Sequence, residues 1–279
     1  MKLGIVTDST SDLPPYLAEQ HGIQVVPSVL IMSGVEYLDG RGLHRDEFYA
    51  RLPGLQSPPT TAAASLGEFA SRYDLLLSNG CDQVLSIHAP ATLTAIVNTA
   101  RQAAQAYSGR ITCVDSGSVS LGLGWQVIAA AEAAEMGLQA ALDAAASTRQ
   151  RVRVFAALDT LEYVRRSGRI PAPLAALGGL LSIKPLIELA EGEVRPVGAV
   201  RTSSQADQRL LSFLLQRGVL HRLAILHTGA EARARGFLDA LMQRASQSVP
   251  REVLFVNVTP VIGTHVGPDG LGFASVSAG

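Results

Sequence analysis

Residues 3–12 read LGIVTDSTSD, an apolar run that ends in six consecutive hydroxyl and carboxylate side chains. A short apolar run bounded in this way is typical of a buried strand, and loops at the carboxyl ends of parallel strands meet at one crevice. Similar clusters occur later, at Thr60 and Thr61, at Thr92 and Thr94 after VLSIHA, and at residues 115–118 (DSGS) after ITCV. We expect these side chains to form one crevice that is rich in neutral hydrogen-bond donors.

The first half of the chain alternates short apolar runs with longer helical patterns, which indicates βαβ units and a largely parallel sheet. The expected strands are residues 3–8, 25–32, 84–89 and 111–116. Helices are expected after Pro14 and Pro15, near Glu47, after Ser65, from Thr94, and in the alanine-rich stretch that ends near Arg149.

The pattern changes near Arg151 and indicates a second α/β domain with some antiparallel pairing. The apolar run 186–200 is interrupted by Glu191, Gly192 and Glu193, which predicts a hairpin with a tight turn. Helical patterns at 204–218 and 230–246 alternate with strand patterns at 222–228, 253–258 and 270–278. We therefore predict two α/β domains, residues 1–150 and 151–279.

Composition excludes several classes of function. The chain has 279 residues, 47% hydrophobic and 17% charged, with a formal net charge of −1, so it lacks the positive field that nucleic acid or an anionic membrane surface would require. The N-terminus enters a strand directly and no uncharged run is long enough to span a membrane, so we expect a cytoplasmic, soluble protein.

Metal and cofactor signals are also weak in the sequence. The six histidines are scattered, Cys81 and Cys113 fit buried thiols, and Gly122 with Gly124 lacks the third glycine of a dinucleotide fingerprint. We interpret these glycines as packing positions and expect neither a metal nor a cofactor.

Some hydroxyls have an ordinary structural explanation as helix caps. Ser11 or Asp12 is expected to cap the helix that begins at Pro14, and Ser65 with Glu68 has the spacing of a capping box. Thr92 and Thr94 flank the start of a helix, where free amides favour an anion, so one of the two is the expected cap and the other is available to a ligand.

The residues alone leave three classes of function open. A carrier would hold an anionic head group on neutral hydroxyls, a lipid or ester hydrolase would use Ser9 or Ser116 as nucleophile, and a protein-joining domain would have an empty, closed cleft. Against the hydrolase, no histidine lies near Ser116 in the sequence, and the sequence shows no assembled nucleophile and base.

The ordered set of motifs resembles the DegV family, bacterial fatty-acid-binding proteins that serve as carrier subunits of a fatty-acid kinase. The matches run in order along nearly the whole chain. They are IVTDSTSDL at 5–13, DSGSVSLGLG at 115–124, SGRI at 167–170, IKP at 183–185, RT at 201–202, and TPVIGTHVG at 259–267.

The resemblance implies two α/β domains that enclose a long-chain fatty acid such as palmitate or oleate, with no catalytic residue in the carrier itself. In the family, hydroxyls of a TSQPS loop and an SSGLSGT loop hold the carboxylate. Here these loops read TAAAS at 61–65 and PATLTAI at 90–96. We therefore expect Thr61 and Thr94, with Thr92, to bind the carboxylate.

The same resemblance assigns three basic residues to the pocket mouth. It implies that Arg201 and His265 engage the kinase or support phosphoryl transfer, and it places Arg169 nearby. The sequence thus predicts a carrier that presents its bound carboxylate to a separate kinase for acyl-phosphate formation in phospholipid metabolism.

Overall fold

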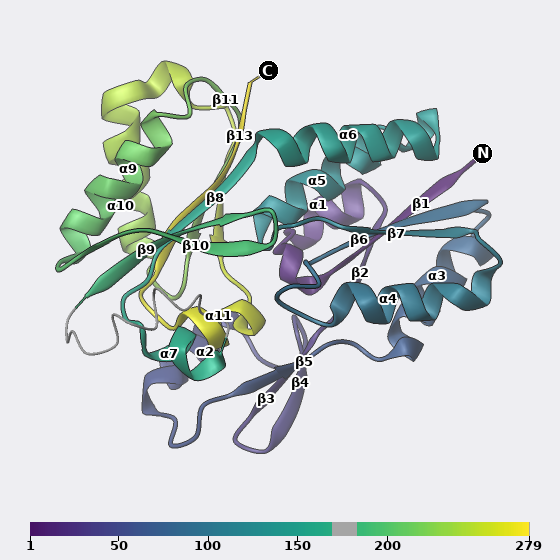
Figure 1. Cartoon of the computed structure of the whole chain (residues 1–279), viewed down its shortest axis with the longest axis horizontal. Helices are drawn as coiled ribbons and strands as arrows, with labels where there is room; N and C mark the ends of the chain where they lie inside the picture. Colours follow the sequence, from purple (N-terminus) through teal and green to yellow (C-terminus); the bar gives the residue numbers. More distant parts are fainter. Residues whose placement is uncertain (169–182, 279) are drawn as a thin grey trace.

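The described part of the chain forms three β-sheets with helices packed around them (Figure 1). The computed structural model describes residues 1–168 and 183–278. Sheet A has the order β2 (Ile23–Val26), β1 (Leu3–Asp8), β6 (Gln83–His88), β7 (Ile111–Asp115). Sheet B has the order β4 (Val35–Leu38), β3 (Val29–Met32), β5 (Thr60–Ala62). Sheet C has the order β10 (Glu193–Val200), β9 (Lys184–Ala190), β8 (Val152–Ala157), β13 (Leu271–Ser277), β11 (Leu220–His227), β12 (Val253–Asn257).

The helices connect and cover these sheets. They are α1 (Pro15–Gln20), α2 (Arg45–Arg51), α3 (Leu66–Ser78), α4 (Ile96–Ala104), α5 (Leu121–Glu132), α6 (Leu138–Arg151), α7 (Glu162–Ser167), α9 (Ser203–Leu215), α10 (Glu231–Ala245) and α11 (Pro260–Val266). Short 3₁₀ turns include η1 (Ser9–Ser11) and η4 (Ala134–Met136). Within the two described ranges, no helix is both long and apolar enough to cross a membrane.

The α/β architecture predicted from the sequence is confirmed. All pairs in sheet A are parallel, and sheet C is antiparallel except between β11 and β12. The hairpin of β9 and β10 is present, with Glu191 and Gly192 at φ 51° and 77°, the left-handed geometry of a two-residue hairpin turn.

The apolar run at residues 25–32 was expected to be one strand but forms two. Pro27 has no N–H for a ladder, and the chain leaves sheet A after Val26 and enters sheet B at Val29. Sheet B is therefore a separate antiparallel unit that the sequence did not reveal. The alanine-rich stretch also divides, into α5 and α6, with Gly137 at φ 97° just before α6.

Helix α5 packs between sheets A and C and joins the two halves of the molecule. A Cβ on Gly122 would collide with Val154 of β8, and a Cβ on Gly124 would lie 2.9 Å from the Ser11 carbonyl oxygen. Both glycines are therefore packing positions, as predicted, because only a bare backbone lets the helix approach strand and loop this closely.

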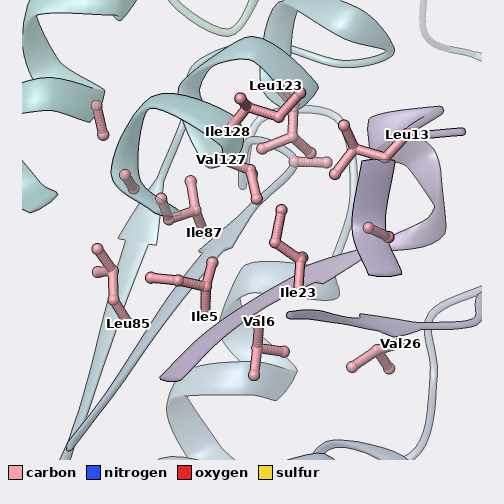
Figure 2. Packing of buried hydrophobic residues seen from close by; sticks show 14 of the residues in the cluster. Ile5, Val6, Leu13, Ile23, Val26, Leu85, Ile87, Leu123, Val127 and Ile128 are labelled. Carbon is pink, nitrogen blue, oxygen red and sulfur yellow. The ribbon is translucent and has the colours of Figure 1, made fainter. Parts of the chain in front are cut away.

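The largest hydrophobic core crosses from one half of the chain to the other. It includes Ile5 and Ile87 of sheet A, Val127 of α5 and Val154 of sheet C. Figure 2 shows the first three side chains grouped where the helix faces the parallel strands. Although every strand of sheet C lies beyond residue 151, the two halves share this core, and the domain boundary near residue 150 stays a prediction.

The buried carboxylate of Asp12 joins three distant segments of the chain. It accepts hydrogen bonds from Arg45 of α2 (2.8 Å), from the Ser120 hydroxyl (2.7 Å) and from the Thr259 backbone N–H (2.8 Å). The Arg45 guanidinium also donates to the Asn257 carbonyl at 2.5 Å. These bonds fix η1, α2 and the end of β12 against one another.

The structure contradicts the expectation that Ser11 or Asp12 caps α1. Pro14 is the N-cap of α1 and no side chain caps that helix, because the Asp12 carboxylate is fully used at the junction. Ser65 does cap α3, accepting from the Glu68 N–H at 3.3 Å, as predicted.

Burial makes the stability of this junction dependent on pH. Burial raises the pKa of Asp12 to about 6 from the ordinary 3.8, although the positive charge of Arg45 and the hydrogen bonds from Ser120 and Thr259 act in the opposite direction. Between pH 4 and 6 the folded protein holds this proton more tightly than the unfolded chain does. The free energy of unfolding contributed by Asp12 therefore falls as pH rises through this window.

Asp12→Asn should remove this dependence. Between pH 4 and pH 7.5, the free energy of unfolding of the wild type should fall by about 2 kcal/mol relative to the variant, since each pKa unit corresponds to about 1.4 kcal/mol. Urea unfolding at several pH values measures the difference. Parallel pH profiles for the two proteins would show that Asp12 titrates alike in the folded and unfolded states.

Candidate functional site

A largely apolar cavity of about 320 Å³ lies between sheet C and the loops at the carboxyl ends of β1, β6 and β7. Sheet C contributes apolar side chains such as Val154, Ile187 and Leu189, and the opposite wall includes Leu93 and Val119. An elongated apolar ligand is the kind of molecule that such a lining would bury favourably.

Polar side chains meet at one wall, where β5 faces α11. The hydroxyl of Thr61 on β5 lies 3.2 Å from Nε2 of His265 on α11, and both residues line the cavity. Thr94 also lines it, just before α4. Three of the residues that the sequence singled out therefore line one cavity, and two of them, Thr61 and His265, are in contact.

Thr94 has a hydroxyl proton available for a ligand. Its oxygen accepts a long hydrogen bond of 3.4 Å from the Ile96 N–H, and the described contacts show no acceptor for its own proton. The N-cap of α4 is Ala95, so neither Thr92 nor Thr94 occupies the cap position itself. A carboxylate beside Thr94 would also face the free amides of this helix start.

Thr92 lies outside the cavity lining and connects the two halves of the chain. Its hydroxyl donates to the Gly192 carbonyl at 2.5 Å, while the Gly192 N–H donates to the Gly117 carbonyl at 2.8 Å. Arg149 pairs with Glu191 at 2.6 Å in the same turn. We name the turn Glu191–Gly192 with these contacts the hairpin latch. Carboxylate binding by Thr92 stays a prediction.

Of the three basic residues that the resemblance assigned to the pocket mouth, only His265 is seen to line the cavity. Arg201 is exposed just before α9 and does not line the cavity, and its backbone N–H donates to the Gln205 side chain at 3.2 Å. Arg169 lies outside the described residues. Their proposed role toward a kinase therefore stays a prediction.

A buried chain of polar side chains beside the cavity was not anticipated from the sequence. Asp8 lies 3.0 Å from Nδ1 of His88, whose Nε2 lies 2.6 Å from the Ser86 hydroxyl, which in turn lies 2.9 Å from the Tyr73 hydroxyl. Ser86 and His88 are two residues apart on one strand and so share a face. The two-residue spacing of Ser86 and His88 in VLSIHA is the sequence signal that could have indicated this contact.

Asp8 connects this chain to the cavity wall. It accepts from the backbone N–H of Ala89 at 3.1 Å and from the backbone and hydroxyl of Thr10, and both of these residues line the cavity. Although the order of Asp8, His88 and Ser86 is that of a hydrolase triad, Ser86 is fully buried and is not part of the lining. The arrangement therefore braces the two loops.

The serines considered as nucleophiles are used in backbone contacts. The Ser9 hydroxyl accepts from the Ser28 N–H at 3.1 Å, and the buried Ser116 hydroxyl donates to the Ser118 carbonyl at 3.0 Å. In the described part of the chain neither serine has a hydrogen bond to a histidine. There, too, no group of three or more histidine, cysteine or acidic side chains could hold a metal ion.

Fold and cavity together define a three-sheet α/β protein with an apolar cavity whose lining includes several hydroxyl side chains. Residues 2–278 match the profile of the family described as "Uncharacterised protein, DegV family". DegV domain-containing proteins of Deinococcus radiodurans and Streptomyces coelicolor are 36% and 34% identical, covering 98% and 97% of this chain and 98% and 96% of the relatives. The chain belongs to the DegV family.

Solved structures of the same fold bind fatty acids. A fatty-acid-binding DegV family protein from Thermus thermophilus is 34% identical, with a TM-score of 0.90 and full coverage of both chains. DegV from Bacillus subtilis, a fatty-acid-binding protein, is 26% identical, with a TM-score of 0.87 and full coverage of both chains.

Thr92→Val should loosen the hairpin latch while keeping the side-chain volume. The loss of one hydrogen bond should lower the free energy of unfolding by about 1 kcal/mol and accelerate amide exchange at Gly192. Thr99→Val is the matched control, because the Thr99 hydroxyl donates only within its own helix, to Ala95. Equal exchange at Gly192 in both variants would show that Thr92 does not hold the turn.

Proposed function

We propose that this protein is a non-catalytic carrier that buries a long-chain fatty acid in its cavity and presents the carboxylate to a partner kinase. The observation that carries the proposal is the apolar cavity whose lining includes the hydroxyls of Thr61 and Thr94. Its relatives from Thermus thermophilus and Bacillus subtilis, described as fatty-acid-binding, support the choice of ligand.

The apolar lining supplies most of the affinity in this proposal. Burying one methylene gains about 0.8 kcal/mol, so a chain of about fourteen contributes on the order of 10 kcal/mol before ordering costs. The head group then needs only orientation. Neutral hydroxyls provide this without a fixed positive charge that would compete with an incoming phosphoryl group.

Thr61 and His265 act as a pair at the head group. If His265 Nε2 donates to the Thr61 oxygen, the Thr61 hydroxyl proton is left for the ligand carboxylate. The imidazole would thereby orient Thr61, while Thr94 supplies the second hydroxyl. His265, with Arg201 and Arg169, is also proposed to support phosphoryl transfer from the kinase, which forms an acyl phosphate. Because that partner uses ATP, we place the reaction in the cytoplasm.

Palmitate binding tests the carrier function directly, and Thr94→Val tests the head-group assignment. The wild type should bind palmitate stoichiometrically, and Thr94→Val should weaken binding by about 1.5 to 3 kcal/mol because a hydrogen bond to a charged group is lost. Fluorescent fatty-acid displacement measures both affinities. No uptake of palmitate or oleate by the wild type would refute the carrier function.

Ser65→Ala is the matched control for this measurement. Ser65 caps α3 and does not line the cavity, so its loss should lower the free energy of unfolding by about 1 kcal/mol and leave palmitate affinity unchanged. A larger loss of affinity in Ser65→Ala than in Thr94→Val would reverse the assignment of the two loops.

Arg201→Ala should separate fatty-acid binding from phosphorylation of the bound fatty acid by the kinase. Arg201 is exposed and lies outside the cavity lining, so the variant should bind palmitate normally and yield little acyl phosphate when a DegV-dependent kinase and ATP are supplied. Arg209→Ala is the control, because it removes another exposed arginine, which lies eight residues after Arg201 and within α9. Parallel loss of palmitate binding would instead assign Arg201 to the pocket.

A further inference from the structure

The hydroxyls that line the cavity differ in whether their protons are already donated to the protein. The Thr10 hydroxyl donates to Asp8, and the Ser120 hydroxyl donates to Asp12 at 2.7 Å. Buried carboxylates hold such protons firmly. These two residues line the cavity but have no proton to offer a ligand.

Ser28 differs because its hydroxyl has no protein partner in the described part of the chain. The residue is 1% exposed and lines the cavity, yet its Oγ neither donates nor accepts there. A buried hydroxyl without a partner is costly, so an oxygen atom supplied from the cavity would satisfy it.

The backbone of Ser28 is fixed on both sides. Its N–H donates to the Ser9 hydroxyl at 3.1 Å, and its carbonyl accepts from the Asp39 N–H at 2.9 Å. Only the rotation about χ1 remains, and this rotation selects among three staggered positions for the hydroxyl. The side chain is thus held at the cavity wall and can turn toward a ligand.

Strand register places Ser28 beside Thr61. In the antiparallel pair of β3 and β5, Leu30 lies opposite Thr61, and Ser28 is two residues before Leu30. Ser28, Leu30 and Met32 are all buried while Val29 and Ile31 are half-buried, so Ser28 shares the buried face of the sheet. Diagonal neighbours of this kind lie about 7 Å apart, a span that one carboxylate with two hydrogen bonds bridges.

Other side chains on this wall offer no substitute. Ala62 and Ala63 line the cavity next to Thr61 and carry no polar side-chain atom. Apolar methylenes placed against Ser28 would leave its hydroxyl unpaired, which favours a ligand oxygen at this position.

We propose that Ser28 donates a third hydrogen bond to the carboxylate of the bound fatty acid, beside Thr61 and Thr94. This inference rests on the proposed carrier function. In this position the Ser28 hydroxyl favours acids over neutral lipids of the same chain length, because a hydrogen bond to a charged oxygen is stronger than one to a neutral oxygen.

The test compares palmitic acid with hexadecanol, which has the same chain length and a neutral head. Ser28→Ala should weaken palmitate binding by about tenfold or more and hexadecanol binding by much less, so the ratio of the two affinities falls. Ser28→Cys, with a weaker donor of similar shape, should lie between the wild type and Ser28→Ala.

Ser11→Ala is the matched control. The Ser11 hydroxyl is also buried without a partner in the described part of the chain, but Ser11 does not line the cavity. Its removal should leave the acid-to-alcohol ratio unchanged. A ratio in Ser28→Ala and Ser28→Cys equal to that in Ser11→Ala overturns the proposal.

Asp39 is the competing partner for the Ser28 hydroxyl. Asp39 Oδ1 is buried and has no hydrogen bond in the described part of the chain. If a water molecule joins the two, Ser28→Ala would lower the stability of the ligand-free protein and leave the affinity ratio intact, which also overturns the proposal. Because the wild type and Thr94→Val are measured beside it, failure of Ser28 alone is distinguishable from failure of the carrier function.

Discussion

The buried carboxylate of Asp12 is the constraint on which the cavity depends. It holds the loop after β1, the start of α2 and the end of β12 at one point, through donors from Arg45, Ser120 and Thr259. Removing any one partner would leave a buried charge or donor unsatisfied, which costs far more than a surface ion pair. Since Ser120 belongs to both the junction and the cavity lining, this contact ties the junction to the wall of the cavity.

A second point of attachment joins sheet C to the first half of the chain. The hairpin latch supplies it, because the turn Glu191–Gly192 meets Thr92, Gly117 and Arg149 through contacts that cross between the two halves of the chain. A Cβ on Gly192 would lie 2.9 Å from the Thr92 hydroxyl oxygen, so only glycine fits here. The strands of this hairpin carry Leu189 and Val194 into the apolar lining. The latch therefore couples the position of sheet C to the shape of the apolar part of the cavity.

Much of the fold was predictable because the sequence patterns are local. Alternating apolar runs and helices indicated the parallel sheet, and Glu191 with Gly192 indicated the hairpin. Sheet B was not predicted, because residues 25–32 form an apolar run that fits a single strand apart from Pro27, which divides it. The contacts of the Asp12 carboxylate were not predicted, because its partners lie 33, 108 and 247 residues away in the sequence. A local helix cap was the simpler explanation for this side chain. Thr61, Thr94 and His265 were singled out from their loop positions and from family resemblance, whereas the proposed role of Ser28 required the register of β3 against β5.

The enclosed Asp8, His88 and Ser86 show why residue types alone do not define an activity. A nucleophile must reach its substrate, but Ser86 faces Tyr73 inside the protein rather than the cavity. In this position the same hydrogen bonds have a different effect, since Asp8 uses both carboxylate oxygens to hold Thr10 and Ala89 on two separate loops. The polar groups around the cavity thus fall into two sets. One set is satisfied within the protein and fixes the walls, and the other, which includes the Ser28 hydroxyl, has no partner for its proton in the described part of the chain. The position of each hydroxyl relative to the buried carboxylates decides to which set it belongs.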